Sequence, residues 1–341
     1  MLYAGCDLHK QTITICVVNQ MGQILLRRRL LCADETGIRR FFEELGQRET
    51  FQLVVEATAS YEWFVRLVEP LAERVLLAHP KKLRVIAEST RKSDRLDAQV
   101  LAEFLALDMI PEAHRPSPRQ QEHRILVRHR QYLRGRMTGA RNKIRRILSN
   151  YNGDRPDLFT QKGLSYLSKV EVNSSDRFVL DQLYAEWEHH GRQLDDIDQR
   201  LKEFARSAPI HETEARAVLQ TIPGVGTVTV DVVVSELGDV RRFRSAKQVC
   251  AYAGLVPGQR ESAGHSKQLG ITKEGSKLLR WVLVEAAWQL VYRTNRWKAI
   301  FEALARRMGK KKAIVAVARR LLCVMFSMLR SGRGYQMALA A

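Results

Sequence analysis

The chain has 341 residues, which at roughly 100 to 200 residues per domain is enough for two or three domains with buried cores. Lys and Arg (56) outnumber Asp and Glu (37), for a formal net charge of +19, and 45% of the residues are hydrophobic. These values exclude a peptide hormone and a mainly disordered chain, and they favour a polyanionic partner such as nucleic acid.

Targeting and redox signals are missing from the sequence. No apolar run approaches the roughly 18 residues that span a bilayer, and the N-terminus lacks a signal-peptide pattern, so we expect no membrane association and a cytoplasmic protein. The five cysteines are scattered and form no C-x-x-C pair, which predicts core thiols in a reducing compartment.

Residues 1–112 are expected to form an α/β domain. Period-two and helical patterns predict, in order, strands at 2–6, 12–18 and 24–31, a helix at 36–46, a strand at 52–56, a helix at 61–72 and a strand at 74–78. An antiparallel meander followed by β-α-β is the order of a ribonuclease-H-like sheet. Actin-like kinases share this order, but Gly5, Gly22, Gly37 and Gly46 form no glycine-rich phosphate loop.

Residues 113–212 are expected to form a helical arm after a proline-containing linker. A basic helix spans 119–146, where ten cations accompany the single acid Glu122, and an acidic helix spans about 175–206. Two long helices joined by a loop predict a helical hairpin or coiled coil. Because a solvated face would interleave both charge signs, the basic helix predicts a surface that follows phosphates of DNA or RNA. The candidate contacts are Arg124, Arg128, Arg134, Arg141, Lys143 and Arg145.

Residues 213–341 are expected to be mostly helical. The pentad Ile222-Pro223-Gly224-Val225-Gly226 is typical of the turn of a helix-hairpin-helix element, in which Gly224 and Gly226 allow the backbone to approach a phosphate. The alternative is a tight connection between helices with no ligand.

Four carboxylates stand where this sheet would bring them together. Asp7 ends the first strand, Glu56 ends the fourth, and Asp94 and Asp97 are spaced i, i+3 on one helix face. Carboxylate oxygens suit Mg²⁺, and two such ions can clamp the attacking and leaving oxygens of a phosphodiester. Taken singly, Asp94 is as well explained as a helix N-terminal charge, and Asp7 as a turn residue.

A glycine-rich basic loop is predicted over 254–270. Ser262 within it is accompanied by Arg260, Lys267 and Lys273, cations that would hold a phosphate under attack by the serine hydroxyl. From these residues alone a loop serine is usually a turn residue, and Ser266 and Ser276 are equal candidates.

The ordered set of motifs resembles the DEDD transposases of the insertion sequence 110 family over nearly the whole chain. The motifs are Gly-Cys-Asp-Leu-His-Lys, Val-Val-Glu-Ala-Thr, Lys-Ser-Asp-Arg-Leu-Asp-Ala, Ile-Pro-Gly-Val-Gly, and the block from Gly-Leu-Val-Pro to Gly-Ile-Thr-Lys. The resemblance implies a RuvC-like domain (1–112) whose Asp7, Glu56, Asp94 and Asp97 bind Mg²⁺, and a C-terminal transposase domain (213–341). Counted back from Ile271-Thr272-Lys273, Ser262 takes the place of the family's serine nucleophile.

The resemblance also implies a mechanism and partners. The family's working model is a tetramer, a dimer of dimers, that holds donor and target duplex DNA with a structured guide (bridge) RNA in the bacterial nucleoid. A covalent phosphoserine would join the serine to DNA, with the acids of a neighbouring subunit completing the site. Two other functions stay open: a Holliday-junction resolvase with water as nucleophile, and a non-catalytic nucleic-acid scaffold.

Overall fold

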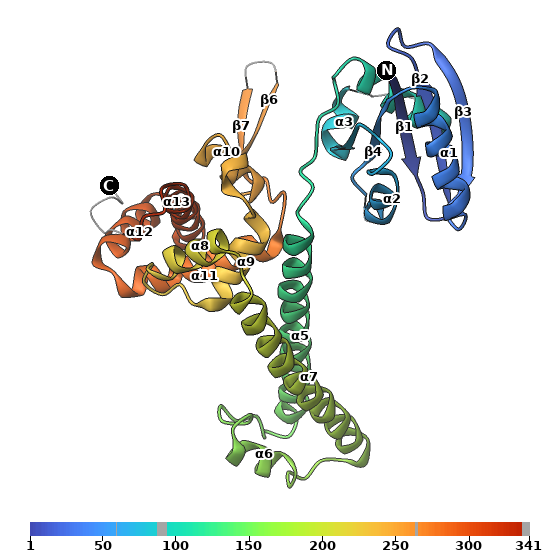
Figure 1. Ribbon diagram of the computed structural model, residues 1–341. Helices are drawn as coiled ribbons and strands as arrows, with labels where there is room; N and C mark the ends of the chain where they lie inside the picture. Colours follow the sequence, from blue (N-terminus) through green and yellow to red (C-terminus); the bar gives the residue numbers. More distant parts are fainter. Residues whose placement is uncertain (59, 87–93, 263–264, 336–341) are drawn as a thin grey trace. The chain divides into compact units, whose positions relative to one another are not determined.

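The computed structural model describes residues 1–58, 60–86, 94–262 and 265–335 (Figure 1). The chain divides into two compact units, residues 1–115 and 116–341. The predicted arm and the predicted C-terminal domain belong to the same unit. Among the described residues, no helix combines the length and apolarity that a membrane span needs.

The first unit is built on a five-stranded mixed sheet in the order β3-β2-β1-β4-β5. The strands are β1 (Leu2–Leu8), β2 (Thr12–Val18), β3 (Ile24–Leu31), β4 (Phe51–Glu56) and β5 (Arg74–Ala78). β1 pairs antiparallel with β2 and parallel with β4, and β4 pairs parallel with β5. The α/β class is as predicted, and the strand order is compatible with a RuvC-like sheet.

Helices cover both faces of this sheet. α1 (Glu35–Arg48) and α2 (Tyr61–Val68) pack on one face over a core that includes Phe42 and Phe64. α2 ends before the predicted Ala72 because Pro70 has no N–H to continue the hydrogen-bond ladder. α4 (Asp94–Ala106) packs on the other face, which we call the α4 face, and α3 (Pro80–Ile86) precedes it.

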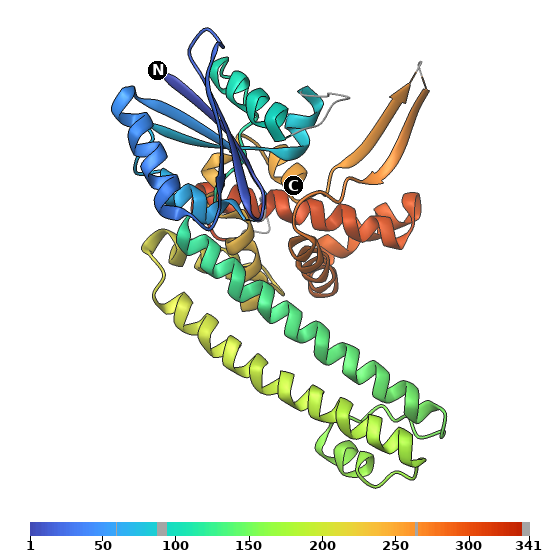
Figure 2. The same ribbon diagram turned by 90° about the vertical axis from the view of Figure 1, so that its right-hand side faces the viewer.

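A two-helix arm begins the second unit. α5 (Pro118–Ser149) starts with Pro118 at its first turn and Ser117 as its N-cap, and it lies beside α7 (Ser174–Arg206), as predicted (Figure 2). The short α6 (Gln161–Leu167) lies at the far end of the arm. A small separate core there contains Ile144, Leu148 and Leu180.

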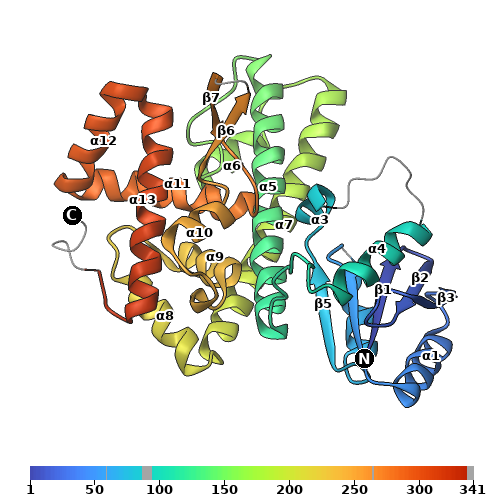
Figure 3. The ribbon, with the colours of Figure 1, turned by 90° about the horizontal axis from the view of Figure 1, so that it is seen from above.

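The rest of the second unit is a helical bundle with one β-hairpin (Figure 3). Its elements are α8 (Ile210–Gln220), α9 (Thr227–Leu237), η1 (Val240–Arg242), α10 (Ala246–Tyr252), β6 (Pro257–Ser262), β7 (His265–Ile271), α11 (Lys277–Arg293), α12 (Asn295–Met308) and α13 (Lys310–Ser331). The expectation of an irregular glycine-rich loop over 254–270 is wrong, because most of that segment pairs as the antiparallel ribbon β6–β7.

Candidate active site and nucleic-acid interface

The parallel pairing of β1 and β4 brings Asp7 next to Glu56. Cys6 pairs with Val55, so Asp7 and Glu56 are the following residues of two neighbouring strands. Cys6 and Val55 belong to the core under α1 and α2, and side chains alternate along a strand. Asp7 and Glu56 therefore both lie on the α4 face, at the carboxyl ends of their strands.

The N-terminal half of α4 packs against β1 close to this edge. Gly5 lies two residues before Asp7, and a Cβ added there would come 2.1 Å from the Ala98 carbonyl oxygen and 2.4 Å from the Ala102 nitrogen. Asp97 immediately precedes Ala98 and is exposed. A glycine is needed for this contact between a strand and a helix backbone, which holds the start of α4 beside the Asp7 end of β1.

The structure thus gathers part of the predicted acidic set. Asp7 is nearly buried, and one of its carboxylate oxygens lies 3.0 Å from Nε2 of His9. Among the described side chains, no three His, Cys, Asp or Glu groups are close enough to share a metal ion. The side chain of Asp94 lies outside the description. The ligand set Asp7, Glu56, Asp94 and Asp97 therefore stays a prediction. The carboxylate oxygens of these residues are hard donors, which suit Mg²⁺.

His9 is a contact of Asp7 that the sequence patterns did not select. It follows Asp7 by two residues, directly after the end of β1, where the chain turns toward β2. A ring N–H directed at the carboxylate would fix its orientation at the edge of the sheet.

The arm neutralises much of its own charge, which corrects the argument from the local charge count. Arg130 donates to both carboxylate oxygens of Asp198 on α7, at 2.5 and 3.1 Å, and Arg136 lies 2.6 Å from Glu186. Arg145 donates to Asp154 at 2.8 Å. Asp198 and Glu186 come from a segment far along the sequence, and Asp154 lies just past the end of α5, so the excess of cations within 119–146 overstated the charge available to a phosphate.

Two of the predicted phosphate contacts face the bundle. Arg124 donates to the carbonyls of Ser235 and Glu236 at 2.9 and 2.8 Å. Arg128 donates twice to the buried Glu236 carboxylate, each time at 3.1 Å. Arg124 and Arg128 therefore hold α5 against α9. Arg134, Arg141 and Lys143 are exposed and form no ion pair with a described residue, although the Arg141 guanidinium lies 4.5 Å from the centre of the Phe159 ring.

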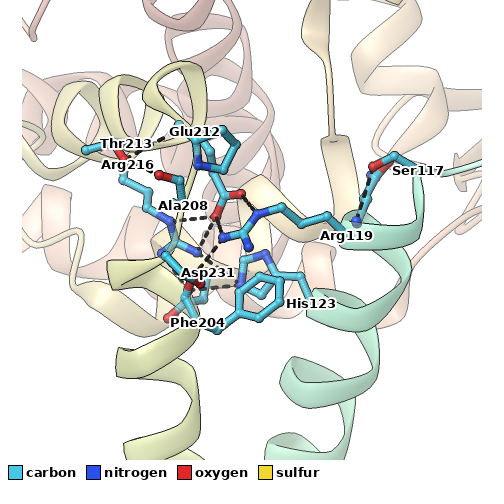
Figure 4. Close-up of polar contacts among 12 residues, drawn as sticks. Ser117, Arg119, His123, Phe204, Ala208, Glu212, Thr213, Arg216 and Asp231 are labelled. Carbon is cyan, nitrogen blue, oxygen red and sulfur yellow. Dashed lines mark hydrogen bonds and ion pairs between the residues drawn. The ribbon is translucent and has the colours of Figure 1, made fainter.

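A polar network joins the base of the arm to α8 and α9 (Figure 4). Arg119 donates to Glu212 at 2.6 Å, and Arg216 donates to Glu212 at 3.0 Å and to Asp231 at 2.6 Å. His123, which is buried, lies 3.0 Å from Asp231. Partial burial alone would raise the pKa of Glu212, but the hydrogen bonds from the two arginines outweigh it and hold that pKa below its ordinary value.

The network fixes the two helices that flank the predicted helix-hairpin-helix turn. At that turn Gly224 has φ +81°, and a Cβ there would come 2.7 Å from Cβ of Gln289 on α11. A Cβ at Gly226 would meet nothing within 4 Å, so the backbone at the N-terminus of α9 is accessible there. The structure explains Gly224 by backbone conformation and packing, and phosphate binding at Gly224 and Gly226 stays a prediction.

Ser262 is the last residue of β6, in register with His265 at the start of β7. Arg260 pairs in the same way with Lys267. Alternation along the two strands assigns these four positions to one face of the ribbon. The side chains of residues 259–262 and 265–268 lie outside the description.

Lys273 follows the ribbon and has φ +57°, in the left-handed region that favours glycine. Its N–H donates to the Gly254 carbonyl at 3.1 Å. Local backbone strain of this kind often accompanies functional sites, and here it occurs at a cation that follows directly after the β6–β7 ribbon.

Two family models match the chain, and both describe transposases. Residues 4–152 match the DEDD transposase model of IS110 type, and residues 216–302 match the model described as the transposase IS116/IS110/IS902 family. The first match includes Asp7, Glu56, Asp94 and Asp97, and the second includes Ser262.

Curated relatives agree over most of their length. The chain is 26% identical to the transposase for insertion sequence element IS1111A of Coxiella burnetii, over 97% of this chain and 90% of that protein. It is 28% identical to the transposase for insertion sequence element IS1328 of Yersinia enterocolitica, over 83% and 82%. A pilin gene-inverting protein of Moraxella bovis is 26% identical over 84% and 82%. With both of its units matched in order, the chain belongs to the IS110 family of DEDD transposases.

Proposed function

We propose that this transposase cleaves and exchanges DNA strands with divalent metal held by Asp7, Glu56, Asp94 and Asp97, and with Ser262 as the nucleophile. The observation that carries the proposal is the parallel register of β1 and β4, which makes Asp7 and Glu56 neighbours on the sheet face that α4 covers. The family uses a divalent metal in general, and the oxygen donors at this edge favour Mg²⁺.

The chemical step is a transfer of one phosphodiester bond. The Ser262 oxygen attacks phosphorus, its bond to phosphorus forms as the bond from phosphorus to one strand end breaks, and the hydroxyl proton leaves to a base. The freed strand oxygen takes up a proton. Arg260, Lys267 and Lys273 would orient the phosphate and balance its charge. Bound Mg²⁺ would supply charge neutralisation at the acids and stabilise the leaving oxygen.

The covalent phosphoserine intermediate conserves the energy of the broken phosphodiester bond. A second strand end can attack the phosphoserine and release Ser262, so strands are exchanged without net hydrolysis. Following the working model that the family resemblance implies, the proposal includes assembly of a tetramer in which one subunit's Ser262 works with a neighbour's acids.

Target choice is proposed to rest on a structured guide RNA. Base pairing would select donor and target sequences while the protein holds backbones, a division of labour that suits a chain with a net charge of +19. Purification from bacteria that carry the element, followed by sequencing of bound RNA, tests this part. Recombination without any specific RNA would refute the guidance and leave the chemistry standing.

The nucleophile is tested with Ser262→Ala and its matched control Ser266→Ala, which belongs to the opposite face of the same ribbon. Labelled DNA should become covalently attached to the wild type and to the Ser266→Ala protein, and to neither Ser262→Ala nor Asp7→Asn. Cleavage without covalent capture by Ser262→Ala would establish the resolvase mechanism. Unchanged DNA processing by Asp7→Asn would refute the metal-binding role of Asp7, as the scaffold alternative predicts.

A further inference from the structure

A dense group of cations surrounds the corner between α12 and α13. We call Arg306, Arg307, Lys310, Lys311 and Lys312 the cationic corner. Figure 3 shows the turn that joins the two helices. Gly309, with φ +82°, is the residue between them. All five charged residues are exposed.

The cationic corner differs from the arm because its charge is not neutralised. None of its five residues forms an ion pair or side-chain hydrogen bond with a described residue, in contrast to Arg124, Arg130 and Arg136 of α5. The corner also has no acid among its neighbours along the chain, since no Asp or Glu occurs from residue 303 to residue 341. Unpaired cations so close together repel one another, and the phosphates of a bound polyanion would neutralise that repulsion. Release of the counterions condensed on the polyanion would drive the binding.

The helices that carry the corner are firmly anchored. Directly after the three lysines, Ala313 and Ile314 of α13 are buried in the bundle core. In α12, Trp297 is 2% exposed and its indole N–H donates to the Tyr335 hydroxyl at 2.8 Å. The corner therefore presents its charges from a fixed backbone, and the N-terminal end of α13 adds the positive end of a helix dipole.

We propose that the cationic corner binds the phosphate backbone of duplex DNA. No Phe, Tyr or Trp occurs between Phe301 and Phe326, so the segment that carries the corner supplies no aromatic platform on which unpaired bases could stack. The preference for DNA over duplex RNA rests on the proposed function. The corner lies beyond the segment 216–302 that the family model covers, so the inference comes from the charge and the packing of this chain.

The test measures how salt weakens binding of a DNA duplex of arbitrary sequence, by fluorescence anisotropy of the full chain in a Ser262→Ala background. Removal of three phosphate contacts should lower the slope of log K against log salt by about 2 to 3, at about 0.9 per contact. We expect this loss for Lys310→Gln/Lys311→Gln/Lys312→Gln and a smaller loss for Arg306→Gln/Arg307→Gln. The arginine variant tests the same proposal if the lysine variant does not fold.

The control removes the same charge elsewhere in the same unit. Arg192→Gln/Arg200→Gln/Arg241→Gln neutralises three exposed arginines that are each paired with an acid, and its slope should stay near that of the parent. An equal loss in the control would show that net charge alone matters and would overturn the proposal. An unchanged slope in both corner variants, or a loss seen only with duplex RNA or single strands, would overturn it as well. Because the background lacks the proposed nucleophile, binding can fail or succeed independently of the phosphoserine chemistry.

Discussion

Replacing Arg124 by methionine separates a structural role in the arm from a role in nucleic-acid binding. The Arg124 side chain is 14% exposed and donates to the carbonyls of Ser235 and Glu236 and to the Tyr252 hydroxyl. Hydrogen bonds from a charged donor contribute about 1.5 to 3 kcal/mol each. The Ser235 carbonyl keeps a bond from Gln120, and the Glu236 carbonyl keeps one from Tyr252, so part of the loss is offset.

We therefore expect Arg124→Met to lower the free energy of unfolding of unit 116–341 by about 2 to 4 kcal/mol. At about 2 to 4 °C per kcal/mol for a unit of this size, its Tm should fall by roughly 5 to 15 °C. Urea unfolding and scanning calorimetry of the full chain measure both quantities. The salt dependence of DNA binding, measured where the variant is folded, should not change.

Arg134→Met is the matched control for this experiment. Arg134 lies on the same helix, is exposed and has no ion pair with a described residue, so its loss should change stability by no more than about 0.5 kcal/mol. If Arg124→Met is as stable as the wild type and its salt slope falls by about one unit, the value for one lost phosphate contact, Arg124 binds nucleic acid and does not hold the arm.

Two further predictions concern the sheet and the polar network. Gly5→Ala should destabilise unit 1–115 by about 1 to 3 kcal/mol and reduce metal-dependent cleavage, because its Cβ would collide with the Ala98 carbonyl of α4. Gly46→Ala on α1, whose nearest contact would be an ordinary 3.6 Å, should be neutral or stabilising in the same urea titration, and equal losses would contradict the packing argument. The lowered pKa of Glu212 contributes stability that is present above the ordinary value of 4.5 and is lost as pH falls through the folded value. Glu212→Gln should therefore be less stable than the wild type at pH 7, and its free energy of unfolding should fall less than that of the wild type below pH 4.5. An acid dependence equal to that of the wild type would exclude Glu212 as the titrating group.

The elements of the first unit could be predicted because their patterns are local. Alternation over residues 12–18 and 24–31 marks two strands with the bounds that the structure gives. The sheet order then follows from short connections and brings Asp7 beside Glu56.

The arm shows where local patterns fail. The basic helix was correctly located, yet its partners Asp198, Glu186 and Glu236 are 50 to 108 residues away along the chain, and nothing in the local sequence indicates these pairs. The β6–β7 ribbon was missed for another reason. Its strands carry polar residues in most positions, so no apolar face marks them, and their glycines favoured a loop.

The ladder of ion pairs along the arm constrains how such proteins diverge. A single inserted residue would advance one helix by about 1.5 Å and rotate everything beyond it by about 100°. Arg136 and Glu186 would then miss each other, and the small core at the tip would come apart. Changes in arm length are consequently expected as matched insertions in both helices, in steps close to whole turns, while the tip itself is free to vary.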